Sequence, residues 1–240
     1  MILGWNVFGT RAIVTMVLIA VVSYLIGSIN SSIILSRAIS GRDIRESGSG
    51  NAGATNMLRT HGKKMGVLTL LIDVAKGIIA VLLAVLVVKY YNSGLAYKVW
   101  GRSDLNTWQG ILDWISLPYI AGLFVILGHN FPLYFGFKGG KGVATSLGVV
   151  MMLDWKIGVM ILVIALIIMA VTRYVSLGSV ISGILFIILE IARMFFDSDW
   201  NLVRLICVIL IGGLIIVRHH ANIKRLLNGT ENKLGAKKKD

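Results

Sequence analysis

The sequence has little charge and a single cysteine. Only 15% of its 240 residues are charged, whereas 56% are hydrophobic, and the mean hydropathy is +0.82. Such a composition excludes an ordinary water-soluble domain, and several apolar runs approach or exceed the roughly 18–20 residues that cross a bilayer. The lone Cys207 lies in an apolar run, so an intrachain disulfide is excluded and a packing role is expected. We therefore expect one all-α integral membrane domain over residues 1–240.

The chain also lacks a recognisable soluble domain, an internal repeat and a long linker. The number of spans depends on Asp154, Trp155 and Lys156, which interrupt an almost continuous apolar stretch. A turn at Asp154 gives seven transmembrane helices, whereas one helix through it gives six. For seven helices, the predicted spans lie near residues 12–38, 66–89, 111–128, 142–153, 157–172, 176–194 and 202–218.

The basic residues favour seven spans, with the N-terminus outside and the C-terminus in the cytoplasm. In that arrangement 16 of the 24 Lys and Arg residues face inward and seven face outward. Six spans would place the basic tail from Arg218 outside, against the positive-inside tendency. The remaining cation, Lys76, lies inside a span, where it can pair with Asp73 on the same helix face. The predicted outer side and its interface, where aromatic rings are favoured, hold all six tryptophans: Trp5, Trp100, Trp108, Trp114, Trp155 and Trp200.

Polar and glycine-rich residues gather in three segments on the predicted inner side. The first, SGSGNAGATNMLRTHGKK at 47–64, combines small hydrogen-bonding side chains, turn-forming glycines and cations. A flexible polar loop before the second span is the simpler interpretation. The density of donors beside an arginine instead favours a substrate site that contains Ser49, Asn51, Thr55, Asn56 and Arg59.

The second segment, GHNFPLYFGFKGGKGVAT at 128–145, places glycines and lysines directly before an apolar run. Glycines allow backbone N–H groups to approach an anion closely, so this segment is typical of a phosphate site at a bilayer surface. It is not a Walker A motif, because residue 135 is Phe and residue 142 is Gly. The candidate residues are His129, Lys138, Gly139, Gly140, Lys141 and Gly142; His129 alone is more often structural than a general base.

The third segment has two parts. RYVSLGSVIS at 173–182 supplies Arg173 and Ser176, and RHHANIKRLLNGTENKLG at 218–235 supplies His219, Asn222 and Glu231. No His, Asp or Glu spacing here matches a familiar metal site, so we expect neither a metal nor another cofactor. The three segments together predict a membrane enzyme that handles a phosphorylated polar substrate and a lipid.

Two other function classes remain as alternatives. A transporter of a phosphorylated metabolite would usually show internal repeats and substrate groups at midspan, but only Asp73 and Lys76 lie inside a span. A phosphatidyl-type transferase would be expected to have an acidic metal-binding cluster, and the acids of the inner side are scattered. We expect no nucleic-acid partner, and the oligomeric state stays open.

The quoted segments resemble the signature motifs of the bacterial acyl-phosphate:glycerol-3-phosphate acyltransferases, in order and over nearly the whole chain. The resemblance implies a seven-helix protein of the bacterial inner membrane with its active site facing the cytoplasm. It further implies that acyl phosphate and glycerol 3-phosphate are the substrates. The acyl group moves to the sn-1 hydroxyl and gives lysophosphatidic acid and phosphate, the first acylation of phospholipid synthesis. The soluble-type acyltransferases, with their H-x-x-x-x-D dyad, are unrelated, and no histidine of this chain starts such a dyad.

The same resemblance implies roles for individual residues. Ser49, Asn51, Thr55 and Arg59 match the first motif, and the glycine loop with Lys138 and Lys141 matches a second motif associated with phosphate binding. Ser176 matches a serine near the site, and His219, Asn222 and Glu231 match functional positions of the last motif. The departing phosphate can itself accept the hydroxyl proton; the alternative is His219 or His129 as general base.

Overall fold

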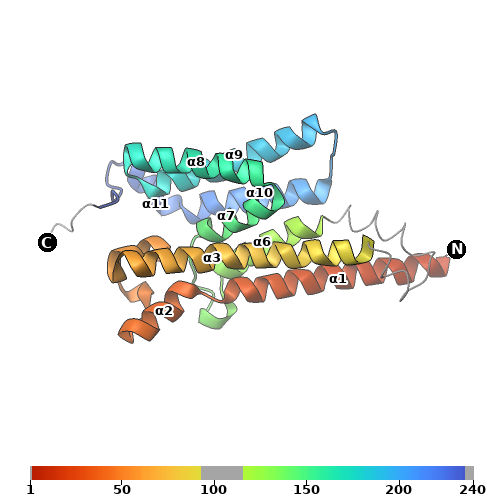
Figure 1. Ribbon diagram of the computed structural model, residues 1–240, viewed down its shortest axis with the longest axis horizontal. Coiled ribbons are helices and arrows are strands. Elements are labelled where there is room, and N and C mark those ends of the chain that lie inside the picture. Colours follow the sequence, from red (N-terminus) through yellow and green to blue (C-terminus); the bar gives the residue numbers. More distant parts are fainter. Residues whose placement is uncertain (1, 93–115, 236–240) are drawn as a thin grey trace.

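The computed structural model describes residues 2–92 and 116–235, and within these ranges every regular element is a helix (Figure 1). In the described part of the chain, five helical stretches are long and apolar enough to cross a membrane, and α10 with α11, bent by 55°, gives a sixth; α7 is a shorter apolar helix. The helices are α1 (Ile2–Ser28), α2 (Ser31–Ser40), α3 (Ala54–Asn92), α6 (Leu117–Asn130), α7 (Val143–Leu153), α8 (Trp155–Thr172), α9 (Val175–Phe196), α10 (Leu202–Arg218) and α11 (His220–Leu227), with 3₁₀ turns η1 (Ile44–Glu46) and η2 (Leu133–Phe135).

The predicted break at Asp154 is confirmed. Asp154 has an extended backbone between α7 and α8, and its carboxylate accepts hydrogen bonds from the N–H groups of Lys156 (2.9 Å) and Ile157 (3.1 Å). An aspartate in this position caps the orphan donors of a helix start, which explains why the apolar stretch forms two helices. The third predicted span begins in residues 111–115, outside the described residues, as do Trp100, Trp108 and Trp114; the structure shows this span from Leu117.

The first two predicted spans are present as apolar stretches, Ile13–Ser40 and Ala54–Tyr90, but neither is a single regular helix. Residues 12–38 are not one helix, because the chain breaks after α1 and Asn30 caps α2 by accepting a hydrogen bond from the N–H of Ile33 (3.2 Å). Helix α3 begins well before residue 66, and Gly62 kinks it with φ +82° and ψ 179°. Glycine adopts such a conformation without steric cost. The kink separates the first two turns of α3 from its long apolar part, as the folded-over start of α3 in Figure 1 shows.

The helices form two groups, with α1, α3 and α6 on one side, α8, α9 and α10 on the other, and α7 between them (Figure 1). Glycines let the neighbours within and between these groups approach closely. A Cβ at Gly27 or Gly128 would collide with the backbone of the partner helix where α1 packs on α6, and Gly77 and Gly148 play the same part between α3 and α7. Small residues at helix crossings are typical of membrane bundles, where close packing replaces the hydrophobic effect.

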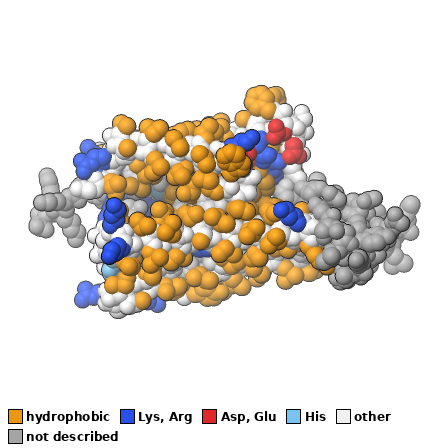
Figure 2. Space-filling model, viewed as in Figure 1, with side chains coloured by type: hydrophobic (Ala, Val, Ile, Leu, Met, Phe, Trp, Pro, Cys, Tyr) orange, Lys and Arg blue, Asp and Glu red, His pale blue; other side chains and the backbone are white. Residues whose placement is uncertain are grey.

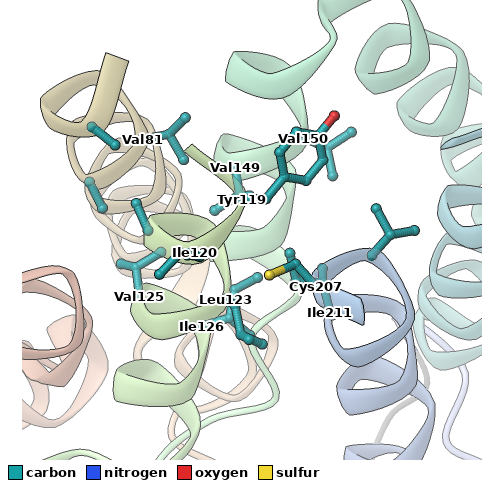
Figure 3. Packing of buried hydrophobic residues seen from close by; sticks show 14 of the residues in the cluster. Val81, Tyr119, Ile120, Leu123, Val125, Ile126, Val149, Val150, Cys207 and Ile211 are labelled. Carbon is teal, nitrogen blue, oxygen red and sulfur yellow. The ribbon is translucent and has the colours of Figure 1, made fainter. Parts of the chain in front are cut away.

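A hydrophobic core connects the two groups through α6 and α7. Figure 3 shows side chains of these helices meeting Val81 of α3 and Cys207 and Ile211 of α10. Cys207 is a free, buried thiol, which agrees with its expected packing role. The remaining labelled members of the core are Tyr119, Ile120, Leu123, Val125, Ile126, Val149 and Val150.

The predicted pair of Asp73 and Lys76 is confirmed, at 2.9 Å between Oδ1 and Nζ, with both side chains buried. The ammonium of Lys76 also donates to the carbonyls of Gly27 (3.3 Å) and Ile29 (3.2 Å) at the end of α1. It lies 2.8 Å from Nδ1 of His129 on α6. One buried cation thus connects α3 with the ends of α1 and α6, and satisfies carbonyls that the break after α1 leaves without helical partners.

A second buried polar network, which the sequence did not indicate, lies near the start of α6. Glu190 is fully buried, and its Oε2 accepts hydrogen bonds from Tyr119 Oη and Arg193 Nη2, both at 3.0 Å. Arg204 of α10 approaches the same carboxylate at 3.7 Å. This network joins α6, α9 and α10 at the ends opposite the predicted inner segments.

Candidate active site

A cavity of about 790 Å³ lies among α3, α7, α8, α9 and α10. Part of its wall is polar and contains side chains from all three predicted segments. The rest is apolar and includes Leu147 and Val150 of α7, Leu162 and Ala165 of α8, and Phe186 of α9. A cavity with one charged part and one hydrocarbon-like part matches a ligand that has a polar head and an apolar chain.

The structure brings all but three of the predicted site residues to this cavity: Ser49, Asn51, Thr55, Asn56, Arg59, His129, Gly139, Lys141, Gly142, Ser176, His219, Asn222 and Glu231. Lys138, Gly140 and Arg173 are not among its lining residues. Lys138 and Arg173 are exposed at the surface, and Gly140 is buried behind the wall. Two further cations, Arg218 and Arg225, line the polar part and strengthen its positive charge.

Asn56 shapes the first segment rather than presenting a free amide to the cavity. Its Nδ2 donates to the carbonyls of Ile44 (3.1 Å) and Ser47 (2.9 Å), and its Oδ1 accepts from the N–H of Ser49 (2.9 Å). With the left-handed glycines on either side of Ser49, these bonds fold the loop so that Ser49 lines the cavity. Arg59 follows on the short first part of α3, before the kink at Gly62.

Asp43 and Arg45, which sequence reasoning missed, connect the first segment to the second. Arg45 Nε donates to Asp43 at 2.9 Å, and its Nη1 donates to the carbonyls of Phe135 and Lys138, each at 2.9 Å. The hydrogen bond from Arg45 lowers the pKa of the Asp43 carboxyl to about 2, so the pair stays charged at physiological pH. The sequence signal was an acidic residue two positions before a basic one at the start of a polar loop.

The glycine loop uses part of its backbone for internal hydrogen bonds. The N–H of Gly139 donates to the carbonyl of Asn130 (3.1 Å), and that of Gly140 donates to the carbonyl of His129 (3.2 Å). Arg218 donates to the carbonyl of Gly140 (2.9 Å). These two N–H groups therefore do not point at an anion in this structure. The donors left near Lys141 are those of the first turn of α7, which starts at Val143 after Gly142 in a left-handed conformation (φ +79°).

Lys141 is the cation that the loop presents to the cavity, and its ammonium donates to Oδ1 of Asn222 on α11. Burial lowers the pKa of Lys141 to about 8, although the nearby Glu231 carboxylate opposes this shift. A lysine with this pKa remains mostly protonated at neutral pH. Its positive charge is poorly solvated, which favours contact with a phosphate oxyanion.

Glu231 organises the third segment. Its Oε1 accepts from Ser176 Oγ (2.7 Å) and Asn222 Nδ2 (2.6 Å), and its Oε2 accepts from Arg225 Nε (2.7 Å). Burial raises the pKa of this carboxyl, but the three hydrogen bonds outweigh burial and hold the pKa below its usual value. The ionised carboxylate therefore fixes side chains of α9 and α11 against the cavity.

The two candidate histidines differ in whether a ring nitrogen is shown to be available to accept a proton. Nδ1 of His219 lies 2.7 Å from the carbonyl of Ile215, so Nδ1 is the protonated nitrogen and Nε2 keeps its lone pair. Nδ1 of His129 faces the ammonium of Lys76, which can only donate, so Nδ1 is an acceptor that is already occupied. This geometry favours a structural role for His129. Among residues 2–92 and 116–235, no group of three or more His, Cys, Asp or Glu side chains could hold a metal ion.

Comparisons with known proteins show which family the chain belongs to. A family model described as glycerol-3-phosphate acyltransferase matches residues 17–229. A glycerol-3-phosphate acyltransferase of Clostridioides difficile (strain 630) is 42% identical over 222 residues, which cover 92% of this chain and 97% of the relative. One of Thermoanaerobacter pseudethanolicus is 40% identical over 224 residues, 92% of this chain and 96% of the relative.

Two solved structures have the same fold. Both are crystal structures of PlsY (YgiH), an integral membrane glycerol 3-phosphate acyltransferase, and both matches cover 92% of this chain and 96% of the solved chain. The glycerol 3-phosphate form matches with a TM-score of 0.72 at 36% identity. The lysophosphatidic acid form matches with a TM-score of 0.68 at 34% identity. On the family model, the relatives and the shared fold, this chain belongs to the glycerol-3-phosphate acyltransferase family.

Proposed function

We propose that this acyltransferase takes its acyl group from acyl phosphate and transfers it to the sn-1 hydroxyl of glycerol 3-phosphate. The products are lysophosphatidic acid and inorganic phosphate, and the reaction is the first acylation of phospholipid biosynthesis. The observation that carries the proposal is the divided cavity, with Arg59, Lys141, Arg218 and Arg225 at its polar part and side chains of α7, α8 and α9 around its apolar part. This division matches two phosphate groups and one acyl chain.

The donor is the one that the resemblance of the motifs implies, and the charge of the cavity suits it. Glycerol 3-phosphate brings one phosphate, and acyl phosphate brings a second beside its carbonyl. Four cations can balance both phosphates, while Glu231 is fully engaged by Ser176, Asn222 and Arg225. The PlsY structures in glycerol 3-phosphate and lysophosphatidic acid forms support the acceptor and the product.

In the proposed reaction, the sn-1 oxygen attacks the acyl carbon to form a C–O bond, and the bond between that carbon and the phosphate oxygen breaks. The hydroxyl proton passes to the departing phosphate, so no protein base is required. Lys141 and Arg59 stabilise the negative charge on the tetrahedral oxyanion and on phosphate. Ser49 contributes a hydroxyl at the cavity wall, and the acyl group transfers directly, without an acyl-enzyme.

His219 is the alternative general base, because its Nε2 keeps a lone pair beside the cavity. His219→Gln tests this role: a loss in turnover of only a few-fold would exclude the general base, whereas a loss of 10²-fold or more in folded protein would establish it. Incubation with donor alone tests direct transfer, which a trapped acylated serine would contradict.

The orientation proposed for the membrane is seven spans, with α7 as the short fourth, the N-terminus outside and the cavity's polar part at the cytoplasmic side of the cell inner membrane. The distribution of side chains supports it, because Figure 2 shows a hydrophobic belt along the bundle with Lys and Arg side chains toward both ends: at the end where α2 and α11 lie they are more numerous and no Asp or Glu is seen beside them in this view, whereas at the opposite end acidic side chains accompany them. Trp155 and Trp200, 64% and 57% exposed, lie at the opposite helix ends. A cysteine introduced in the tail after Leu234 and probed with an impermeant maleimide in inverted and right-side-out vesicles tests the orientation.

The deciding assay for the reaction is acyl transfer by purified protein in detergent. Labelled glycerol 3-phosphate is offered with palmitoyl phosphate in one tube and palmitoyl-CoA in another. Lysophosphatidic acid in the first tube only is the expected result, and product from the CoA tube would contradict the proposed donor. If folded protein formed no product in either tube, a transporter of a phosphorylated metabolite would become the better interpretation. Flux assays in liposomes would test that function.

A further inference from the structure

Arg173 matches a signature motif but lies outside the cavity. It ends α8 in a left-handed conformation (φ +63°), and its side chain is exposed. Its guanidinium donates from Nε (3.2 Å) and Nη2 (2.9 Å) to the carbonyl of Leu234. Because both hydrogen bonds go to a backbone carbonyl and the side chain does not line the cavity, we expect Arg173 to act on the structure of the site rather than on the substrate.

The backbone of Arg173 makes a second connection to the same residue. Its carbonyl accepts a 2.7 Å hydrogen bond from the N–H of Leu234, and Lys233 lies over the ring of Tyr174 at 5.6 Å from its centroid. At its other end, this segment is fastened to α11, where the N–H of Thr230 donates to the carbonyl of Arg225 (2.8 Å). Residues 228–234, which we call the C-terminal strap, are therefore held at both ends.

Glu231 lies between these two attachments, and Glu231 and Asn232 of the strap line the cavity. The side chain of Glu231 is 6% exposed and binds Asn222 through one oxygen. The amide oxygen of Asn222, Oδ1, accepts a hydrogen bond from the ammonium of Lys141. A continuous set of hydrogen bonds thus runs from the strap through Asn222 to the cation of the glycine loop.

We propose that Arg173 is a positioning residue that fixes the C-terminal strap and thereby holds Glu231, Asn222 and the Lys141 ammonium in place. Without the guanidinium, the Leu234 end of the strap keeps its backbone bond to Arg173 and the contact of Lys233 with the ring of Tyr174, but loses two hydrogen bonds. Misplacement of a catalytic group by about 1 Å can cost as much as 10²-fold in rate. The inference rests on the proposed function, because it assigns Lys141 to the phosphate of the substrate.

The electrostatics of the cavity supply a readout specific to this role. The carboxylate of Glu231 raises the pKa of Lys141, and a displaced strap would take this carboxylate away. The pKa of Lys141 would then fall, since burial and the cations around it act in the opposite direction. Among the described residues, the titratable and charged groups that interact electrostatically with Lys141 include Arg59, Arg218, His219, Arg225 and Glu231.

The test compares Arg173→Ala and Arg173→Lys with Arg42→Ala in purified full-length protein. Arg42 is an exposed arginine near the first segment and does not line the cavity, so its replacement removes the same charge as a control. Alanine keeps a Cβ at the left-handed position, so the variant removes the guanidinium without relieving backbone strain. We expect kcat/KM for glycerol 3-phosphate to fall roughly 10- to 100-fold in Arg173→Ala, to recover partly in Arg173→Lys and to stay unchanged in Arg42→Ala.

Two further measurements separate positioning from a general loss of stability. In Arg173→Ala, the alkaline limb of the kcat/KM profile should move to lower pH. In an Arg173→Ala/Glu231→Gln double variant, the loss should not exceed that of Glu231→Gln alone by more than about twofold. An unchanged alkaline limb, fully multiplicative losses or a fall of less than twofold in Arg173→Ala would each overturn the proposal. Activity of the parent protein with palmitoyl phosphate tests the proposed function separately.

Discussion

Replacing Lys76 by methionine removes the cation that balances Asp73 inside the bundle. Both side chains are buried, and Nζ lies 2.9 Å from Oδ1. Removing one partner of a buried ion pair costs about 3–5 kcal/mol, because the remaining charge loses its compensation. Ser31 Oγ, which donates to Asp73 at 2.9 Å, is too weak a partner to replace an ammonium. We therefore expect Lys76→Met to destabilise the protein by about 3–5 kcal/mol.

The double variant Asp73→Leu/Lys76→Met isolates the charge from the other contacts of the lysine. It has no unpaired carboxylate, but four groups lose a hydrogen-bond partner in it: the carbonyls of Gly27 and Ile29, Nδ1 of His129 and the hydroxyl of Ser31. Each orphaned group costs about 1 kcal/mol. Three of the four lose their partner in Lys76→Met as well, whereas only the single variant keeps a buried carboxylate without its cation. It should therefore be more stable than Lys76→Met alone.

The single cysteine provides the assay. Cys207 is 3% exposed and packs against α6, so a thiol-reactive fluorophore labels it only when the bundle opens. Labelling during a temperature ramp in detergent then reports unfolding of all variants with no added probe site. A Lys76→Met protein as stable as the parent, or a double variant less stable than Lys76→Met, would refute the assigned role of the buried charge.

Three other substitutions test the site. Because burial lowers the pKa of Lys141 to about 8, its amine loses the proton as pH rises through 8, and kcat/KM should fall about tenfold per pH unit above that value. Lys141→Arg should abolish this alkaline decrease in kcat/KM, and a decrease that persists in the variant would exclude Lys141 as its source. Gly140→Ala would push a Cβ into His129 and the carbonyl of Ala52, so the cysteine-labelling assay should show a loss of about 1–3 kcal/mol in the free energy of unfolding. Gly213→Ala, whose Cβ would have no atom within 4 Å, should leave the free energy of unfolding unchanged. Ala165→Phe fills the apolar part of the cavity, and its turnover should fall at least tenfold more with palmitoyl phosphate than with octanoyl phosphate; equal losses would place the acyl chain elsewhere.

The spans could be predicted because a bilayer demands long apolar runs, and the break at Asp154 because a single acid can cap the next helix. The break after α1 was missed, although GSINSS at 27–32 contains the capping asparagine. The apolar residues on both sides of that motif obscured it. The kink at Gly62 left no signal beyond an isolated glycine in a helical pattern.

The site residues could largely be found because burying polar groups and cations in a membrane protein is energetically unfavourable, so clusters of them indicate a functional site. Their individual orientations could not. The N–H groups of Gly139 and Gly140 donate to carbonyls of α6, and Arg173 binds the strap, since both arrangements depend on which segments the fold brings together. The buried Glu190 was missed because two of its partners, Tyr119 of α6 and Arg204 of α10, come from other helices and only the fold brings them together.

The divided cavity bears on how the product leaves. A palmitoyl chain that passed through water would lose roughly 12 kcal/mol of favourable transfer free energy, at about 0.8 kcal/mol per methylene. In the proposed orientation, the charged groups of this cavity lie beside the interfacial loops and its hydrocarbon-like wall lies between the helices, the same order of layers as in a membrane leaflet. Lysophosphatidic acid formed there already has the orientation of a membrane lipid. It can partition sideways into the bilayer without exposing its tail to solvent.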